Sequence, residues 1–331
     1  MTVFVTGANG LVGSYVVKQL LGLGYKIKIL LRENADKQLL TNVLSQCEIV
    51  IGDILDTTVL AKSLEDCQKV VHCAGLVSFD PRKKRAIFET NVLGTANVVN
   101  ASLNAGIQKL VHVSSIAALG RQYNSLIINE KTKWEDTELN SSYAKSKYLA
   151  ELEVFRGGEE GLNFSMVNPS IILGAGDLNR SSTKLIGFIK KMSWCYPAGY
   201  LNVVDVRDVS YAICQLLEIE HKDRLVLNAE CISYRDFYNH IGKAYGLAES
   251  RFQIPTFILR LVAIYSGIKT FLFGGEPIIT KENIRFLNKK FIYESLYYST
   301  LFGSKPISAI DSISTTISDL KTKSHKNDFQ K

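Results

Sequence analysis

The sequence predicts an α/β protein built on a doubly wound parallel sheet, followed by a smaller mixed α/β region. Short apolar runs rich in β-branched residues alternate with segments of helical spacing through the first half of the chain. A glycine-rich stretch, TGANGLVG at residues 6–13, follows the first of these runs. With 331 residues, 46% of them apolar, the chain can bury a large core.

Six candidate strands account for the parallel sheet. Each is a nearly continuous apolar run, which is typical of strands covered on both faces. They are expected at residues 3–6, 26–32, 47–53, 69–75, 109–115 and 163–170. The segments between them have helical spacing, which the first shows with Leu11, Val12, Tyr15, Val16 and Leu20. Residues 1–175 are therefore expected to form one α/β domain.

The alternation stops after residue 175. Short strands expected at 201–206 and 224–229 lie among helical stretches. We expect residues 176–320 to form a smaller substrate-binding region over the carboxyl edge of the sheet, where open α/β sheets bind ligands. A strand and helix near 202–228 are expected to return to the first domain, and residues 321–331 are expected to be a polar tail.

The most apolar segment, residues 254–273, is predicted to be a packed helix or a pocket lid. Its length would suffice to span a membrane, but Arg260 and Lys269 interrupt it. Pro255 and Gly267 are typical of a helix start and a weak point. No membrane span is expected, and contact with a membrane surface is the alternative.

Charge and cysteine usage exclude several classes. The net charge of +7 is spread along the chain except for the basic run at 82–85, which follows Asp80-Pro81 and is interpreted as a solvated helix face rather than a nucleic-acid patch. The five histidines are scattered, so no metal site is expected. The six cysteines form no Cys-x-x-Cys pair, and the first strand begins by Val3 without room for a signal peptide. Both observations indicate a cytoplasmic protein with reduced thiols.

The three glycines Gly7, Gly10 and Gly13 lie between a strand and an amphipathic helix. In such a unit one glycine permits the tight turn, a second lets the backbone approach a pyrophosphate, and a third lets helix and strand pack closely. The pyrophosphate then meets free amides at the helix N-terminus. This context predicts a Rossmann-type dinucleotide-binding domain.

The spacing Thr-Gly-x-x-Gly-x-x-Gly resembles that of the extended short-chain dehydrogenase/reductase family, of the NAD-dependent epimerase/dehydratase type. Further motifs of that family follow in order: GDILD at 52–56, HCAG at 72–75, NVLGT at 91–95, VSS at 113–115, YAKSK at 143–147 and NPSIILGAG at 168–176. The branch that contains dihydroflavonol reductases and 3-beta-hydroxysteroid dehydrogenases is the most similar. The resemblance also implies a homodimer.

The resemblance implies a cofactor site along the carboxyl edge of the sheet. Asp53 would meet the adenine, unless it caps the next helix, and Asn91 would lie near the cofactor or serve a structural role. The full set of implied contacts is Thr6, Gly7, Asn9, Gly10, Leu11, Val12, Gly13, Arg32, Asp53, Ile54, Ala74, Gly75, Asn91, Pro169 and Ile171.

The second strand indicates which dinucleotide is bound. An acid about twenty residues after the glycines would bind the ribose hydroxyl of NAD, whereas a basic residue would pair with the 2′-phosphate of NADP. Here the strand ends Leu31-Arg32-Glu33. Arg32 favours NADPH, to which Lys37 could add, while Glu33 leaves NAD open.

Tyr143 and Lys147 share one face of a predicted helix that follows a strand ending in Ser114-Ser115. Reduction of a carbonyl by hydride leaves an alkoxide that needs a proton. The ammonium of Lys147, together with the positive nicotinamide of the oxidised cofactor, should lower the tyrosine pKa from about 10. Ser115, chosen by its match to the family position, would bind the carbonyl oxygen, with Ser114 as the alternative. A second Tyr-x-x-x-Lys pair starts at Tyr265, lacks a partner serine and is assigned to packing.

These features predict an NADP-dependent oxidoreductase that interconverts a ketone and a secondary alcohol on a small, largely apolar substrate. An NAD-dependent nucleotide-sugar epimerase or dehydratase is the alternative, for which Arg180, Lys184 and Arg235 could bind the diphosphate. Asn168 replaces the family's arginine before proline and counts against this alternative. A noncatalytic dinucleotide sensor is the third hypothesis, but it would not need to keep Ser, Tyr and Lys together.

Overall fold

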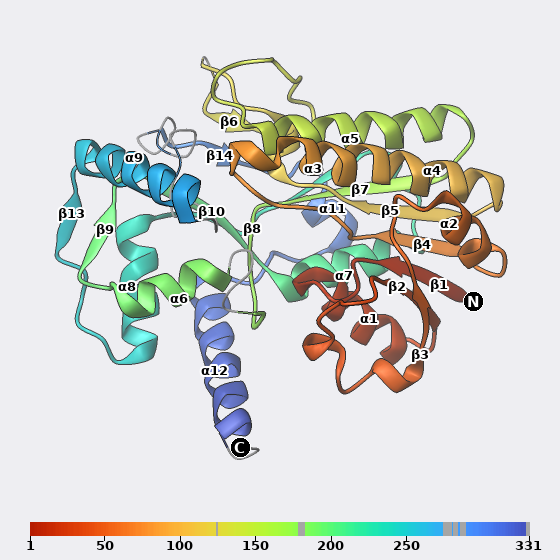
Figure 1. Cartoon of the computed structure of the whole chain (residues 1–331), viewed down its shortest axis with the longest axis horizontal. Coiled ribbons are helices and arrows are strands. Elements are labelled where there is room, and N and C mark those ends of the chain that lie inside the picture. Colours follow the sequence, from red (N-terminus) through yellow and green to blue (C-terminus); the bar gives the residue numbers. More distant parts are fainter. Residues whose placement is uncertain (124, 178–182, 274–279, 281–283, 285–288, 329–331) are drawn as a thin grey trace.

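The computed structural model describes residues 1–123, 125–177, 183–273, 280, 284 and 289–328. Figure 1 shows a central sheet with helices above and below it, and a smaller group of helices and short strands beside it. Among the described residues, no helix combines the length and the apolar character needed to cross a bilayer.

The central sheet has seven parallel strands in the order β11-β7-β5-β4-β1-β2-β3. Its strands are β1 (Thr2–Thr6), β2 (Lys26–Leu31), β3 (Cys47–Ile51), β4 (Lys69–His72), β5 (Lys109–Val113), β7 (Phe164–Pro169) and β11 (Arg224–Leu227). From β1 the chain proceeds outward to β2 and β3, then returns to β4 and proceeds the other way. The strand order therefore reverses between β1 and β4, and ligands of open α/β sheets bind at such a switch point.

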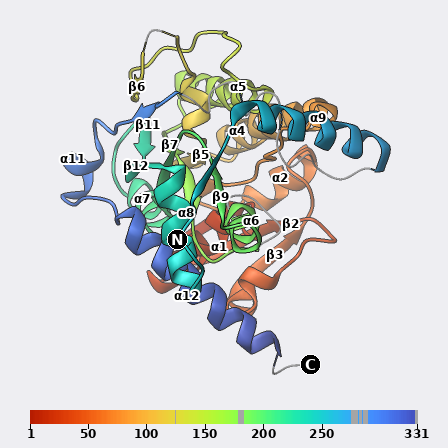
Figure 2. The same ribbon diagram turned by 90° about the vertical axis from the view of Figure 1, so that its left-hand side faces the viewer.

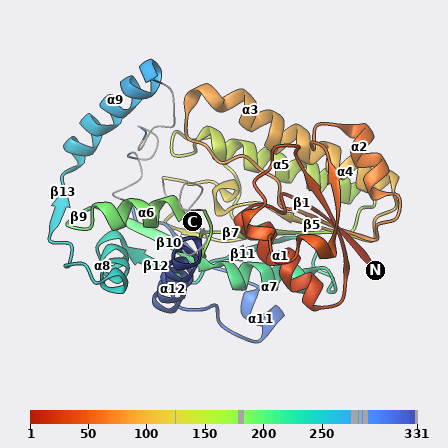
Figure 3. The same cartoon turned by 60° about the horizontal axis from the view of Figure 1, so that its bottom comes forward.

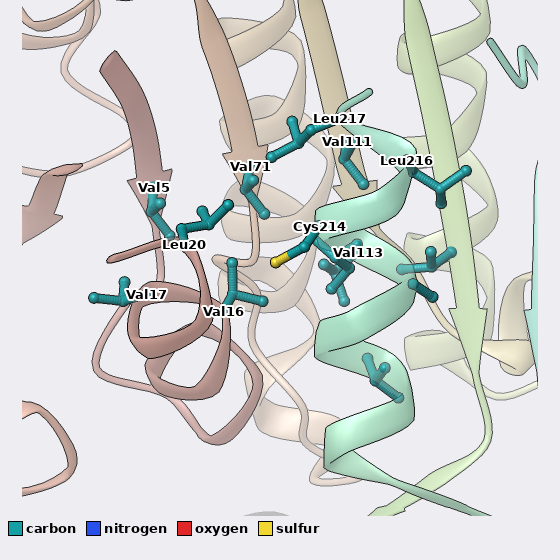
Figure 4. Close-up of a cluster of buried hydrophobic side chains, with 14 of the residues drawn as sticks. Val5, Val16, Val17, Leu20, Val71, Val111, Val113, Cys214, Leu216 and Leu217 are labelled. Carbon is teal, nitrogen blue, oxygen red and sulfur yellow. The ribbon is translucent and has the colours of Figure 1, made fainter. Parts of the chain in front are cut away.

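Helices cover both faces of this sheet. One face packs on α1 (Leu11–Gly22) and α7 (Val206–Leu216), and Figure 4 shows their side chains against those of the strands: Val16, Val17, Leu20, Cys214, Leu216 and Leu217 meet Val5, Val71, Val111 and Val113. The other face packs on α2 (Thr57–Leu64), α4 (Gly94–Asn104) and α5 (Ser142–Glu159). Burial on both faces accounts for the continuous apolar strands.

The smaller region is built around a three-stranded sheet in the order β12-β10-β8. Its strands are β8 (Ile171–Leu173), β10 (Tyr200–Asp205) and β12 (Glu230–Ser233). They pack on α6 (Thr183–Lys191), α8 (Tyr234–Tyr245) and α12 (Ala309–Asp328). Figures 2 and 3 show α12 crossing below this sheet, while α9 (Thr256–Phe273) lies at the outer edge of the region.

Shorter elements connect these layers. They are η1 (Gln38–Leu40), η2 (Leu44–Gln46), η3 (Pro81–Lys83), α3 (Lys84–Phe88), the π-helix η4 (Glu89–Leu93), η5 (Ile116–Leu119), β6 (Ile127–Ile128), β9 (Cys195–Pro197), β13 (Phe252–Ile254), β14 (Ile292–Tyr293) and α11 (Tyr298–Phe302).

The structure confirms the predicted fold class and places all six predicted strands in the central sheet. The strand predicted at residues 163–170 corresponds to β7 of the central sheet, and the next strand, β8, belongs to the smaller sheet. Residues 201–206 fall mainly in β10 of the smaller sheet, whereas α7 and β11 return to the central one. The polar segment expected at residues 321–331 continues α12 as far as Asp328.

Candidate active site

The glycine loop lies at the switch point and is tightly constrained. Gly7 has a φ of 66°, and a Cβ there would lie 2.6 Å from the amide nitrogen of Ala74 after β4. A Cβ on Gly13 would lie 2.3 Å from the carbonyl oxygen of Gly7. Gly10 is the N-cap of α1, and a Cβ there would meet only that same carbonyl, at 3.2 Å. Gly7 and Gly13 thus pack the loop, while Gly10 keeps the first turn of α1 accessible to an anion.

One hollow includes residues of this loop, and a second lies at the ends of β2 and β3. The larger, of about 520 Å³, is lined by Arg32, Glu33, Asn34, Ile51, Gly52 and Asp53. The smaller, of about 50 Å³, is lined by Asn9, Gly10, Leu11, Asp36, Leu39, Asp177 and Thr183. Lys37 is not among the lining residues of either. The donor set fits a dinucleotide, because free helix amides face one hollow while an arginine and two carboxylates surround the other.

Asp53 does not cap the following helix. That cap is Asp56, whose Oδ1 accepts hydrogen bonds from the backbone nitrogens of Thr58 and Val59 at 3.0 and 3.1 Å. Asp53 instead accepts one from the Leu55 nitrogen and lines the larger hollow. The neighbouring Ile54 is buried. This placement removes the capping alternative for Asp53.

A buried hydrogen-bond network links the ends of β1 and β4 to α4. The Thr95 hydroxyl donates to the carbonyl of Asn91 at 2.6 Å, so it accepts from His72 Nε2, at 3.0 Å. His72 Nδ1 is then the acceptor for the Thr6 hydroxyl, at 2.7 Å, and Thr6 in turn accepts from the Ala74 nitrogen at 3.2 Å. Thr6 and His72 therefore hold the glycine loop and the HCAG segment in register.

Asn91 continues this network to the tyrosine helix. Its Oδ1 accepts from the Leu76 nitrogen at 2.7 Å, and its Nδ2 donates to the Leu76 carbonyl and to the Ser146 hydroxyl, at 3.0 and 2.9 Å. Ser146 donates to the Tyr143 carbonyl at 2.7 Å. Asn91 is 1% exposed, so the side chain has a structural role in shaping the loop that follows β4. Sequence reasoning missed His72, Thr95 and Ser146.

Two buried histidines lie beneath the site. Burial, together with the charge of Lys147, lowers the pKa of His72 to about 3, and the same causes hold the pKa of His112 well below its usual value. Their ring centroids are 5.1 Å apart. Neither ring nitrogen of His112 has a hydrogen-bond partner among the described residues. Both rings are neutral at physiological pH.

Ser115, Tyr143 and Lys147 come together at the carboxyl end of β5. Ser115 caps η5, accepting from the Ala117 nitrogen at 3.2 Å. Tyr143, in the first turn of α5, lies close enough for the Ser115 side chain to lower its pKa. Lys147 is buried, and its Nζ donates to the Val113 carbonyl at 2.8 Å. The three residues therefore lie where the carboxyl end of β5 meets the first turns of α5.

The protein's own groups do not produce the expected lowering of the Tyr143 pKa, which also relies on the positive nicotinamide of the cofactor. Burial raises this pKa, and the hydrogen bond with Ser115 only partly opposes the effect. Burial also lowers the pKa of Lys147 to about 8, against the charges of Glu151 and Cys73. Lys147 is not among the groups that shift the Tyr143 pKa, and burial sets the direction of that shift.

Ser114 is committed to a different cluster. Its hydroxyl donates to Glu151 Oε1 at 2.5 Å, and the Nδ2 of Asn168 donates to the same oxygen at 2.5 Å and to the Ser115 carbonyl at 3.0 Å. Arg224 Nε donates to Glu151 Oε2 at 2.7 Å. Because the Ser114 hydroxyl is hydrogen-bonded to Glu151, Ser115 is the serine that is available to Tyr143.

An apolar side chain lies against Tyr143. The ring of Phe79 meets that of Tyr143 edge-on at 5.9 Å, and Val77 and Phe79 are both partly exposed. On the other side of the helix, Tyr148 stacks on Trp134 at 4.5 Å.

The remaining predicted residues fall in several places. Ala74 and Gly75 follow β4, Pro169 ends β7, Ile171 starts β8, and Val12 lies in the first turn of α1. Arg180 lies outside the described residues, and Lys184 and Arg235 are exposed on α6 and α8. Tyr265 was assigned to packing, which is wrong, because it is 68% exposed on α9.

Comparison with known proteins is consistent with this geometry. A family model described as the NAD dependent epimerase/dehydratase family matches residues 3–225. A Synechocystis protein with the provisional name dihydroflavonol 4-reductase is 27% identical over 299 residues, covering 88% of this chain and 86% of its own. The sterol-4-alpha-carboxylate 3-dehydrogenase (decarboxylating) of Dictyostelium discoideum is 25% identical over 303 residues, covering 87% and 91%.

Solved structures resemble the whole chain. The crystal structure of gox2253 has a TM-score of 0.82 at 28% identity and covers 97% of this chain and 98% of that chain. A UDP-glucose 4-epimerase from Thermotoga maritima has a TM-score of 0.79 at 17% identity, with 98% and 99% covered, and shares the fold.

Proposed function

Since the chain belongs to the NAD dependent epimerase/dehydratase family, we propose that it is an NADP-dependent oxidoreductase that interconverts a ketone and a secondary alcohol on a small, largely apolar substrate. The observation that carries the proposal is the meeting of Ser115, Tyr143 and Lys147 at the end of β5, with Phe79 beside the tyrosine. These side chains offer a proton, a cation and a carbonyl-binding hydroxyl.

The dinucleotide would be held by the glycine loop, the first turn of α1, and the hollow beside Arg32 and Asp53, and when bound it supplies the hydride. Ser115 hydrogen-bonds the substrate oxygen, because its side chain already faces Tyr143. Tyr143 gives its hydroxyl proton to that oxygen as negative charge develops there. Lys147, charged below a pKa of about 8, holds the nicotinamide ribose and favours the phenolate that remains.

NADPH rather than NADH is supported by Arg32. The side chain is exposed at the end of β2 and lines the larger hollow, where a guanidinium can pair with a 2′-phosphate. Glu33 and Asp53 line the same hollow, so Arg32 is the cation on which this preference depends.

An apolar substrate is supported by the exposed hydrocarbon of Val77 and Phe79 and by the names of the relatives, a reductase and a sterol dehydrogenase. A nucleotide-sugar epimerase has less support, because Asn168 is fully buried against Glu151 and cannot meet a diphosphate. All six cysteines are free thiols, which supports a reducing compartment such as the cytoplasm.

Equilibrium binding of NADPH and NADH, followed by nicotinamide fluorescence, tests the cofactor. We expect a preference for NADPH of at least about ten-fold, or ~1.4 kcal/mol. Arg32→Ala should remove it, while Lys37→Ala, which does not line the hollow, should keep it. Equal affinities in the unmodified protein would refute the assignment of NADP.

Turnover of a panel of apolar ketones with NADPH tests the chemistry. Tyr143→Phe should retain NADPH binding and lose at least about 100-fold in kcat. Tyr148→Phe, which removes a hydroxyl five residues further along the same helix, should leave kcat nearly unchanged. Equal activity of the two variants would exclude Tyr143 as the proton donor.

A further inference from the structure

Helix α9 exposes most of its large apolar side chains, whereas a packed helix buries them. Its buried positions form a stripe of small or polar residues broken by one leucine: Leu259, Ala263, Ser266 and Thr270, each at most 7% exposed. Large apolar side chains cover the exposed surface instead: Phe257, Ile258, Leu261, Val262, Ile264, Tyr265, Ile268 and Leu272, each 38% exposed or more. An exposed apolar surface of this extent marks an interaction site.

Aromatic side chains continue this surface at the start of the helix. Trp194 and Phe252 are 60% and 64% exposed, and their rings meet edge-on at 6.4 Å. Phe252 begins β13, which leads directly into α9. Exposed tryptophan and phenylalanine beside an apolar helix are typical of a boundary between lipid and water.

The charge around the surface is positive. Helix α9 contains Arg260 and Lys269, both exposed, and no acidic residue. Its last turns contact the basic run, because Arg82 Nη1 donates to the Thr270 carbonyl at 2.9 Å. Residues 80–89 contain four basic and two acidic side chains, a net charge of +2.

The helix also lies next to the approach to the active site. Phe79 contacts Tyr143, and Arg82, three residues later, contacts the far end of α9. Figures 1 and 3 place α9 along the outside of the molecule, and no other described element covers its outer side. The segment 77–82 therefore connects the exposed surface to the tyrosine.

We propose that α9, with Trp194, Phe252 and the basic run at 82–85, binds the surface of a membrane that contains anionic lipids. The helix lies in the plane of the headgroups with its apolar side chains among the upper acyl chains, and the basic side chains meet lipid phosphates. This binding does not depend on the identity of the substrate or the cofactor.

Vesicle flotation of the whole protein tests this proposal. We expect the protein to float with vesicles of phosphatidylcholine and phosphatidylserine, to bind vesicles of phosphatidylcholine alone more weakly, and to dissociate from the former as salt is raised. Arg260→Glu with Lys269→Glu should weaken binding by at least about five-fold per residue on the anionic vesicles.

A matched pair of double variants tests the surface itself. Leu261→Ser with Ile268→Ser should reduce partitioning by at least about ten-fold per side chain. Leu23→Ser with Ile310→Ser changes residues of similar exposure, 58% and 50%, at the end of α1 and on α12, and should bind as the unmodified protein does. Unchanged melting temperatures show that the variants remain folded.

The proposal is overturned if the protein floats with neither kind of vesicle. An equal loss of binding by the Leu261 and Ile268 double variant and by the Leu23 and Ile310 double variant would overturn it as well. It is also overturned if light scattering shows a dimer that the Leu261 and Ile268 changes dissociate, because a second copy of the chain then covers α9.

Discussion

Replacing the buried carboxylate of Glu151 by an amide tests how much the hydrogen bonds and the ion pair of this group contribute to the stability of the fold. Glu151 is 0% exposed and accepts hydrogen bonds from Ser114, Asn168 and Arg224, and the side chain of Arg224 is only 12% exposed. Glu151→Gln leaves the guanidinium without its counter-charge and turns an amide donor toward groups that already donate. Breaking a buried pair in this way costs about 3–5 kcal/mol in the free energy of unfolding.

Urea unfolding followed by circular dichroism measures this cost. Glu153→Gln is the control, since Glu153 pairs with Arg156 on the same helix with both side chains at least 30% exposed, and its loss should cost about 0–1 kcal/mol. The double variant Glu151→Gln with Arg224→Gln should be more stable than Glu151→Gln alone, because no charge is then left unpaired. A loss below about 1 kcal/mol for Glu151→Gln, equal to that of the control, would refute this reasoning.

Three further predictions follow from the same geometry. Gly13→Ala, whose Cβ would lie 2.3 Å from a carbonyl oxygen, should abolish dinucleotide binding in a fluorescence titration, whereas Gly22→Ala at the end of the same helix meets nothing within 4 Å and should stabilise the fold by about 0.5–1 kcal/mol. His112→Leu removes two buried nitrogens that lack partners among the described residues, so it should raise the free energy of unfolding at neutral pH by about 1 kcal/mol. The folded-state pKa of His112 lies below its unfolded value of 6.5, so the unfolded chain binds more protons and the free energy of unfolding falls as pH drops below 6.5. His112→Leu should flatten this fall in urea titrations, and an unchanged dependence of the unfolding free energy on pH would contradict the prediction. Because the pKa of Lys147 is about 8, NADPH affinity should decline as pH rises above 8, and Lys147→Met should abolish that decline.

Local motifs made the fold predictable, and they also pointed to three residues that the structure brings together at the end of β5. The glycine spacing and the Tyr-x-x-x-Lys pair are each contained within one element and its flanking turn, so a short stretch of sequence determines their geometry. Strands that are apolar on both faces can likewise be predicted from the sequence without knowledge of the tertiary structure.

The hydrogen-bond network could not be predicted in the same way. Thr6, His72, Thr95 and Ser146 lie on four different elements, and their hydrogen bonds depend on how those elements pack. The raised pKa of Tyr143 depends on burial, which a sequence motif does not report. The orientation of α9 was equally hidden, because its apolar residues are spread around the helix and only packing decides which side is covered.

The position of β11 bears on how the protein is made. Residues 224–227 supply the edge strand beside β7, and Arg224 supplies the counter-charge of Glu151. A polypeptide truncated after residue 175 would present β7 as an unpaired apolar edge, a template for aggregation. During synthesis the central sheet therefore stays incomplete until residue 227 has left the ribosome, when α6 and β10 have already emerged. The dinucleotide-binding half is continuous in space but not along the chain, so its first 175 residues alone lack the edge strand β11 and the counter-charge of Glu151.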